Sequence, residues 1–288
     1  MEKVLVAGGT GLLGTFLVKQ LNDQGIKNIS HGHKSEAQLN FDMTDFSQVK
    51  MFLDKINPKL IVNLVCLSDV EKNEKDYQLA KKLNIQPVVN ISKWIKSKEE
   101  NIKFIQVSTD HVYDKEGISC EEDVVIKNNY ARTKFEAEKI ALSANALILR
   151  TNFFGRSLNP NRESFTDWID RNIERQNFPL NLFNDVYFSP IHISTLSEII
   201  IKLFKSYNSG VYNLGSKDGM SKAQFALEYS DILKNDKSKI KLTSIDKMKF
   251  AANRPKGMMM DISKFEKKFN IELPSLREEI KLTKIGEI

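Results

Sequence analysis

The residues best placed to do chemistry are Tyr130 and Lys134, which stand four positions apart in a Tyr-Ala-Arg-Thr-Lys segment. A free phenol titrates near pH 10, which is too high for efficient proton exchange at neutral pH. On a helix the lysine lies on the same face, so its ammonium should lower the tyrosine pKa. Thr109, after an apolar run, is placed to hydrogen-bond the same substrate oxygen. We predict Thr109, Tyr130 and Lys134 as catalytic residues for carbonyl reduction, with the proton coming from Tyr130.

A hydride donor is indicated by a glycine-rich segment near the N-terminus. Gly8, Gly11 and Gly14 are spaced three apart, after an apolar run at 3–7 and at the start of an amphipathic stretch at 12–23. The first glycine permits a tight turn, the second lets backbone approach a pyrophosphate, and the third lets helix and strand pack closely. The helix N-terminus then offers N–H groups to the phosphates. We predict dinucleotide binding by the residues of this turn, namely Gly8, Thr10, Gly11, Leu12, Leu13 and Gly14.

The segment after the second predicted strand bears on the choice of cofactor. NAD-preferring sites usually carry an Asp or Glu there for the ribose hydroxyls, whereas basic groups accommodate a 2′-phosphate. Here His33 and Lys34 follow the strand, and no acidic residue precedes Glu36. The sequence therefore favours NADP(H), with NAD(H) as the alternative. Asp42 and Met43, after the next short segment, are expected to contact the adenine.

Alternating elements must hold these residues in position. In the first half of the chain, apolar runs alternate with stretches whose apolar residues recur at helical spacing. This alternation predicts right-handed β-α-β units and an α/β, Rossmann-type doubly wound parallel sheet covered on both faces. The predicted strands are 3–7, 26–30, 60–66, 102–108, 146–154 and 210–214, and the predicted helices are 12–23, 46–56, 77–96 (kinked or restarted by Pro87), 130–142 and 193–204 (opened by Ser194 or Thr195).

The rest of the second half is less regular and predicts a second, smaller unit. Its expected helices are 164–175, 221–233, one capped by Asp261 that runs to 269, and one opened by the capping box of Ser275 and Glu278. The helix at 193–204 and the strand at 210–214 should return to the parallel sheet. We therefore predict an NAD(P)-binding Rossmann domain at 1–155 plus about 193–214, and a discontinuous substrate-binding lobe at about 156–192 and 215–288.

Composition excludes several other classes of protein. The net charge of +6 is spread among interspersed acids and bases, without the basic stripe that nucleic-acid binding requires. No apolar run is long enough for a membrane helix and no signal-peptide pattern is present, so we expect a cytoplasmic protein with no membrane partner. Cys66 and Cys120 are far apart and should be reduced thiols. The four histidines have no metal-ligand spacing, so no metal site is predicted.

The motifs together resemble those of extended short-chain dehydrogenase/reductases, and most of all the dTDP-4-dehydrorhamnose reductase group of sugar-nucleotide reductases. The resemblance covers essentially the whole chain, through the glycine turn, Asn63, the segments 108–114, 129–134 and 149–153, and Arg254-Pro255. It implies NADPH-dependent reduction of a 4-keto nucleotide-linked deoxysugar, as in dTDP-rhamnose and polysaccharide synthesis. It also implies cofactor contacts from Val65, Cys66, Leu67, Val107, Tyr130 and Lys134, and substrate contacts from Thr109, Asp110, Phe153 and Arg254.

The chain departs from this family pattern at two places, which leaves alternatives open. His111 stands where these reductases usually carry an aromatic residue and related dehydratases an acidic one, which disfavours a dehydratase. The segment 64–68 lacks the usual alanine- and histidine-rich run. A nucleotide-sugar epimerase of the same superfamily and a non-catalytic NADP-binding regulatory subunit remain as alternatives. A homodimer is an option that the resemblance suggests and the sequence does not decide.

Overall fold

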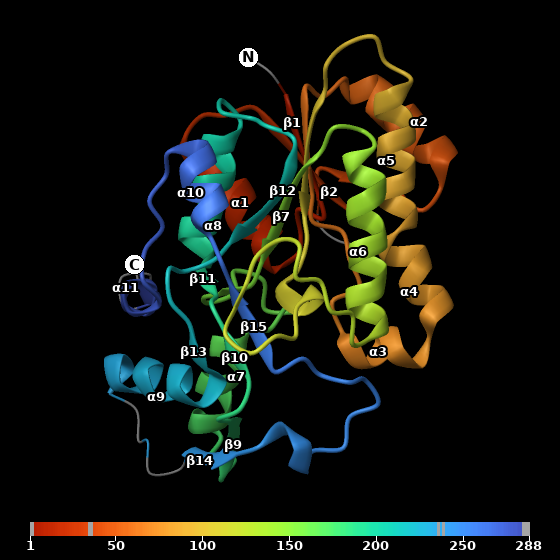
Figure 1. Cartoon of the computed structure of the whole chain (residues 1–288). Coiled ribbons are helices and arrows are strands. Elements are labelled where there is room, and N and C mark those ends of the chain that lie inside the picture. Colours follow the sequence, from red (N-terminus) through yellow and green to blue (C-terminus); the bar gives the residue numbers. More distant parts are fainter. Residues whose placement is uncertain (1–2, 34–36, 235–236, 238–239, 284–288) are drawn as a thin grey trace.

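The computed structural model describes residues 3–33, 37–234, 237 and 240–283. Its centre is a seven-stranded sheet in the order β12-β7-β5-β4-β1-β2-β3, and every neighbouring pair in it is parallel (Figure 1). The strands are β1 (Val4–Ala7), β2 (Asn28–Gly32), β3 (Leu39–Asn40), β4 (Leu60–Asn63), β5 (Lys103–Val107), β7 (Leu147–Thr151) and β12 (Gly210–Leu214).

Helices cover both faces of this sheet. On one face lie α1 (Leu12–Asp23) and α8 (Ile193–Leu203), and on the other lie α2 (Phe46–Ile56), α5 (Gln86–Lys96) and α6 (Asn129–Leu142) (Figure 1). The sheet is therefore doubly wound. Its strand order reverses between β1 and β4, which is the point where such sheets bind ligands outside the carboxyl ends of the strands.

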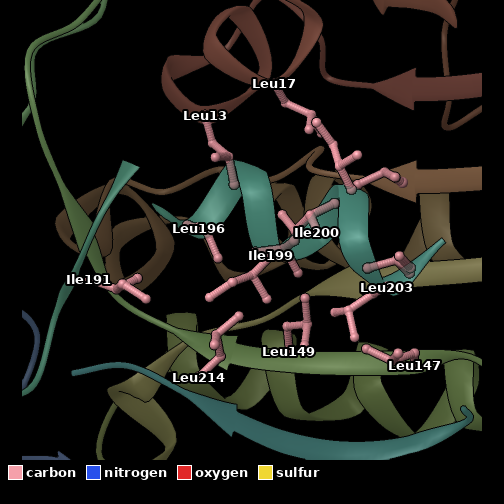
Figure 2. Close-up of a cluster of buried hydrophobic side chains, with 14 of the residues drawn as sticks. Leu13, Leu17, Leu147, Leu149, Ile191, Leu196, Ile199, Ile200, Leu203 and Leu214 are labelled. Atoms are coloured by element: carbon pink, nitrogen blue, oxygen red, sulfur yellow. The ribbon is translucent and has the colours of Figure 1, made fainter. Parts of the chain in front are cut away.

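The core on the α1 and α8 side is built from large aliphatic residues. Figure 2 shows Leu13 and Leu17 of α1 on one side of α8, and Leu149 of β7 and Leu214 of β12 on the other. All four side chains are buried. Each contributes about 1.5–3 kcal/mol relative to an exposed position. This packing fixes the direction in which α1 leaves the glycine-rich turn.

A second unit lies beyond the carboxyl ends of the parallel strands (Figure 1). Its four-stranded sheet has the order β13-β10-β15-β6, and two pairs of short strands, β11 with β8 and β14 with β9, accompany it. The strands are β6 (Ile118–Ser119), β8 (Phe153–Phe154), β9 (Leu180–Phe183), β10 (Tyr187–Phe188), β11 (Ile191–His192), β13 (Met220–Ser221), β14 (Ile240–Thr243) and β15 (Gly257–Met260). Its helices are α7 (Phe165–Glu174), α9 (Lys222–Leu233) and α11 (Leu276–Lys281). The helix between β15 and α11, α10 (Ser263–Phe269), instead packs against β12 of the parallel sheet through Phe265 and Phe269.

Several predicted elements are shorter or divided in the structure. The strand predicted at 60–66 ends at Asn63, whose Oδ1 accepts from the Val65 N–H at 3.2 Å. The strand predicted at 146–154 divides into β7 and β8, and β8 pairs with β11 outside the main sheet. The helix predicted at 77–96 is two helices, α4 (Tyr77–Asn84) and α5, because Pro87 restarts it.

The helix ends show which capping predictions hold. The capping box of Ser275 and Glu278 opens α11 as predicted. The cap predicted at Ser194 or Thr195 is wrong, because the His192 side chain accepts from the Ser194 N–H and α8 begins at Ile193. Asp261 accepts from the Ser263 N–H at 2.9 Å, although the capping position itself is one residue later.

The short helix α3 (Val70–Lys75) was not predicted. Within the described ranges, no helix has both the length and the apolar character needed to cross a bilayer.

Candidate active site at the carboxyl edge of the parallel sheet

The glycine-rich turn has the geometry of a phosphate cradle. Gly8 has φ +82°, a left-handed conformation that favours glycine. A Cβ on Gly14 would lie 2.2 Å from the Gly8 carbonyl oxygen, so only glycine allows α1 this close to the turn. Gly11 stands at the N-terminus of α1, where no side chain caps the backbone N–H groups and the first turn carries no acid. These features fit the pyrophosphate of a dinucleotide.

Within this turn, the predicted cofactor residues differ in what they can offer a ligand. The Leu13 side chain is buried in the core, so only its backbone faces the turn. Leu12 is half-buried. The Thr10 carbonyl accepts from Asn159 Nδ2 at 2.8 Å, which ties the second unit to the turn. Asn159 was not predicted, because no motif marks a contact between residues so far apart in sequence.

His31 of β2 contacts the glycine-rich turn through a hydrogen bond to Gly8, a role that was also not predicted. Its Nε2 lies 2.9 Å from the Phe41 carbonyl oxygen and so carries the proton, while its Nδ1 accepts from the Gly8 N–H at 3.4 Å. Burial lowers the pKa of this imidazole, an effect that the Phe41 hydrogen bond opposes. A neutral His31 therefore holds Gly8 in place at the end of β1.

Four residues were predicted to contact the adenosine part of the cofactor, and the structure describes three of them. His33 is exposed beyond β2, and Lys34 lies outside the described residues. Asp42 is half-buried, and its Oδ1 accepts from the Thr44 N–H at 2.8 Å. The Met43 side chain is buried in the core and its carbonyl accepts from Asn90, and its contact with the adenine stays a prediction.

Val65, Cys66 and Leu67 follow the end of β4 and are half-buried. The backbone of Leu64 and Val65 lies 3.1 Å from where a Gly8 Cβ would be. The glycine-rich turn and this segment are thus in direct contact at the point where the strand order reverses. Both are positioned to line a ligand that enters there.

The three predicted catalytic residues meet at the ends of β5 and α6. Tyr130 and Lys134 project from the first turns of α6, and Thr109 follows β5. The Tyr130 phenol is hydrogen-bonded with Thr109, and Lys134 Nζ donates to the Val107 carbonyl at 2.7 Å. The three predicted residues and Val107 are all buried.

The effect expected of Lys134 on Tyr130 is not found. Burial raises the pKa of the Tyr130 phenol, the neighbouring Cys66 adds to the increase, and the Thr109 hydrogen bond opposes it. The spacing of the two residues predicted a lowered pKa. The prediction was wrong for this state because the Lys134 ammonium is directed to the Val107 carbonyl and because the phenol is desolvated.

A buried network of polar side chains connects β5, β7 and α6, the elements that position the predicted catalytic residues. Arg150 of β7 forms a bidentate pair with Glu138 of α6, at 2.7 Å for its shortest contact, and both side chains are almost fully buried. Glu138 also accepts from the Ser108 hydroxyl at 2.5 Å, and Arg150 donates to the Tyr113 hydroxyl at 2.8 Å. The carboxyl ends of β5 and β7 are thereby fixed to the helix that carries Tyr130.

Asp110, predicted to contact substrate, lies buried beside this group. Its Oδ2 accepts from Asn152 Nδ2 at 2.7 Å. Burial raises the pKa of Asp110 to about 6, while the Asn152 hydrogen bond and the charge of Lys222 oppose the increase. His111 packs edge-on against the Tyr130 ring at 5.4 Å between centroids.

A cavity of about 590 Å³ opens between this edge and the second unit. Such a volume is typical of small-molecule sites. Aromatic residues form much of its wall, and Val70 and His111 connect it to Tyr130, against which both pack. The remaining wall includes Phe165, Trp168, Phe183, Phe250, Lys222 and Arg254.

The imidazole of His111 is neutral in this wall. Burial lowers its pKa to about 3, and the charges of Lys222 and Arg254 lower it further. Its Nδ1 is buried without a hydrogen-bond partner among the described residues. Its backbone N–H is held by the Thr109 hydroxyl at 3.2 Å, which joins this wall of the cavity to the catalytic group.

Two predicted substrate residues have different positions relative to this cavity. Arg254 lines it, but its guanidinium is paired with Glu71 of α3 at 2.8 Å. Phe153 is half-buried and packs against the main core. Glu71 also accepts from the Ala251 N–H at 2.8 Å, so α3 anchors the segment that carries Arg254. Sequence reasoning missed Glu71 because α3 is short and its partners are about 180 positions away.

Comparison with known proteins agrees with this architecture. The family model described as the RmlD substrate binding domain matches residues 1–284. The probable low-salt glycan biosynthesis reductase Agl14 of Haloferax volcanii is 25% identical over 287 residues, covering 96% of this chain and 95% of that protein. The dTDP-4-dehydrorhamnose reductase of Salmonella typhimurium is 27% identical over 290 residues, covering 94% and 93%.

Among solved structures, the dTDP-4-dehydrorhamnose reductase (rfbD) of Bacillus anthracis in complex with NADP has a similar fold. The TM-score is 0.87 at 22% sequence identity, and 99% of each chain is covered. At this identity the likeness speaks for the fold alone.

The chain belongs to the RmlD substrate binding domain family. The predicted kinship with the sugar-nucleotide reductases of the extended short-chain dehydrogenase/reductase group is confirmed, as is the Rossmann-type α/β fold. The prediction that the chain is an oxidoreductase of this NAD(P)H-dependent family is confirmed too. The roles of individual residues stay predictions.

Proposed function

We propose that this protein is an NADPH-dependent reductase of a 4-keto nucleotide-linked deoxysugar. The observation that carries the proposal is the position of Tyr130. Its phenol is hydrogen-bonded with Thr109 at the carboxyl edge of the parallel sheet, and its ring packs against Val70 and His111, which line the aromatic cavity. This position supports Tyr130 as the proton donor to a sugar bound beside the cofactor. Both curated relatives named above are reductases.

In the proposed reaction the chain's own residues position the ketone and move one proton. The nicotinamide, when bound, supplies the hydride. Tyr130 donates its proton to the carbonyl oxygen, and Thr109 donates a hydrogen bond to that same oxygen. Lys134, held by the Val107 carbonyl, would contact the cofactor. The raised pKa of Tyr130 keeps the phenol protonated, although a lower pKa would make it a more efficient acid at neutral pH.

The substrate is proposed to occupy the cavity, with its sugar toward Tyr130. The aromatic wall suits the flat base of a nucleotide, and Arg254 offers donors to the diphosphate. The segments 156–192 and 215–288 supply nearly all of this wall, which supports the proposed division into a Rossmann domain and a substrate-binding lobe. One strand of the lobe's sheet, β6, nevertheless comes from the first 155 residues.

NADP(H) is proposed as the preferred cofactor, with His33 and Lys34 near the 2′-phosphate. The residues described at the end of β2 include no acid that could take the ribose hydroxyls. Gly8, Gly11 and Gly14 with the N-terminus of α1 are proposed to hold the pyrophosphate.

The test is NADPH oxidation with a dTDP-4-keto-6-deoxysugar generated in place by a dehydratase. We expect NADPH absorbance to fall in proportion to sugar reduced, and NADH to be used less efficiently. A converted sugar with no net change in cofactor would indicate an epimerase instead. NADPH binding without conversion of any 4-keto sugar nucleotide would indicate a non-catalytic regulatory subunit.

A further inference from the structure

Three residues that line the cavity carry a formal charge, and two of these already have an ion-pair partner. Arg254 pairs with Glu71 at 2.8 Å, and Glu163 pairs with Arg171 at 2.9 Å. The third, Lys222, has no ion pair with any residue that the structure describes. The cavity wall therefore holds one basic side chain that has no contact ion pair with a described residue.

The surroundings of Lys222 attract a cation, but no carboxylate among the described residues lies within ion-pair distance of its ammonium, and Asp110 acts on it only from farther away. Lys222 is the first residue of α9, and its Nζ lies 5.8 Å from the ring centroids of Phe165 and Phe188. Aromatic faces stabilise an ammonium modestly but accept no conventional hydrogen bond. Burial lowers the pKa of Lys222, while the charge of Asp110 raises it and that of Arg254 lowers it further. An anion bound in the cavity would oppose this lowering and favour the charged form of Lys222.

Lys222 is also in the right place for the middle of a nucleotide sugar. It interacts electrostatically with Asp110, next to Thr109 at the reacting end, and with Arg254, which also lines the cavity. A sugar whose carbonyl meets Tyr130 would be followed by its diphosphate, which these two basic side chains could then meet. Burying the diphosphate's negative charges costs free energy unless hydrogen-bonded cations meet them.

We infer that Lys222 binds the diphosphate of the substrate and supplies the main positive charge for it, an inference that rests on the proposed function. Arg254 contributes hydrogen-bond donors but little net charge, because Glu71 already neutralises it. The motif resemblance pointed only to Arg254, so Lys222 is a substrate-binding residue that the sequence pattern did not reveal.

The experiment compares Lys222→Met, Lys222→Arg and the control Lys264→Met. Methionine keeps the apolar stem against the aromatic rings, and Lys264 is partly exposed on α10, outside the cavity. Binding of dTDP, UDP, GDP and CDP to the wild type is measured by calorimetry, and the tightest diphosphate is then compared with its nucleoside. In Lys222→Met we expect diphosphate affinity to fall about tenfold or more, as for a lost hydrogen bond to a charged group. Nucleoside and NADPH affinities should be unchanged.

Two further variants sharpen the assignment. Lys222→Arg should retain most of the diphosphate affinity, and Lys264→Met all of it. Removing both charges of the other pair, with Glu71→Gln and Arg254→Met together, should weaken the diphosphate less than Lys222→Met does. A larger loss in the double variant would overturn the inference.

Other outcomes would also overturn it. Unchanged diphosphate affinity in Lys222→Met would mean that Lys222 does not bind the diphosphate, and an equal loss for the nucleoside would mean that it only shapes the cavity. If no diphosphate binds the wild type, the inference fails as well. These are equilibrium measurements without turnover, so they are separate from the proposed function, which NADPH oxidation by the wild type decides.

Discussion

The carboxyl edge of the parallel sheet and the cavity of the second unit differ in how completely their polar groups are satisfied. At the edge, Lys134 is held by a backbone carbonyl, and Arg150 by a buried carboxylate. In the cavity, Lys222 lacks an ion pair and His111 Nδ1 lacks a hydrogen-bond partner among the described residues. At the edge, these basic side chains therefore have protein partners without any ligand. The cavity keeps polar groups free for a ligand.

From this difference we predict that a substitution at the carboxyl edge of the sheet lowers kcat but leaves NADPH affinity unchanged. Tyr130→Phe should show this effect most strongly. The variant keeps the ring that packs with Val70 and Ala252 but loses the proton. We expect kcat to fall by about 10²–10⁴, the range for one proton-transfer group. NADPH affinity, measured by fluorescence titration, should stay as in the wild type. Turnover within tenfold of the wild type would remove Tyr130 from the proposed role.

The network beneath the edge should be a large contributor to stability, which comparison of two Arg–Glu pairs can test. Arg150 and Glu138 are almost fully buried, whereas Arg277 and Glu228 form a similar bidentate pair at the surface. Arg150→Met should lower the free energy of unfolding by about 3–5 kcal/mol, because it leaves a buried carboxylate unpaired. Arg277→Met should cost about 1 kcal/mol or less. Equal costs in urea denaturation would contradict the proposed rigidity of the edge.

Two aspartates four positions apart, Asp110 and Asp114, should give opposite pH dependence. The pKa of Asp110 is raised to about 6 by burial, so its stabilising contribution is full below about pH 3.8 and is lost as pH rises through about 6. The loss amounts to about 3 kcal/mol. Asp114 has a lowered pKa, because N–H groups of Lys256 and Gly257 outweigh its burial, and its contribution is lost as pH falls.

The measurement is the free energy of unfolding of the wild type minus that of each Asp→Asn variant, as a function of pH. The difference for Asp110→Asn should decline as pH rises from about 4 to 7, and the difference for Asp114→Asn should rise from lower pH upward. A flat Asp110 difference would mean that this carboxyl ionises as freely in the folded protein as in the unfolded one.

The same contrast explains how much could be predicted from sequence. The glycine turn, the strand and helix alternation, and the spacing of Tyr130 and Lys134 are local patterns, and the fold built from them was predicted almost element by element. The lowered pKa of Tyr130 was not found, because burial and the partner of Lys134 depend on the assembled structure.

The second unit was predicted only in outline. Several of its strands are two residues long, which leaves no periodic signal to detect. Its important contacts, Glu71 with Arg254 and Asn159 with Thr10, join segments more than 140 positions apart. His31 and Lys222 gave no signal either, since an isolated histidine or lysine in a sequence is usually a surface residue. Only the folded structure shows that His31 is buried beside the glycine-rich turn and that Lys222 lines the cavity.

The smallest effect is expected where the edge meets solvent, at the site proposed for the 2′-phosphate. Replacing His33 and Lys34 together with alanine should weaken NADPH by roughly two- to thirtyfold, because an exposed ion pair contributes about 0.2–1 kcal/mol. NADH, which lacks the 2′-phosphate, should bind as before. Lys27→Ala is the control, since Lys27 is exposed just before β2, at the opposite end of that strand. The effect should shrink at high salt, as screening of exposed charges requires. Equal losses for both cofactors would mean that these residues support the turn and that the phosphate is bound elsewhere.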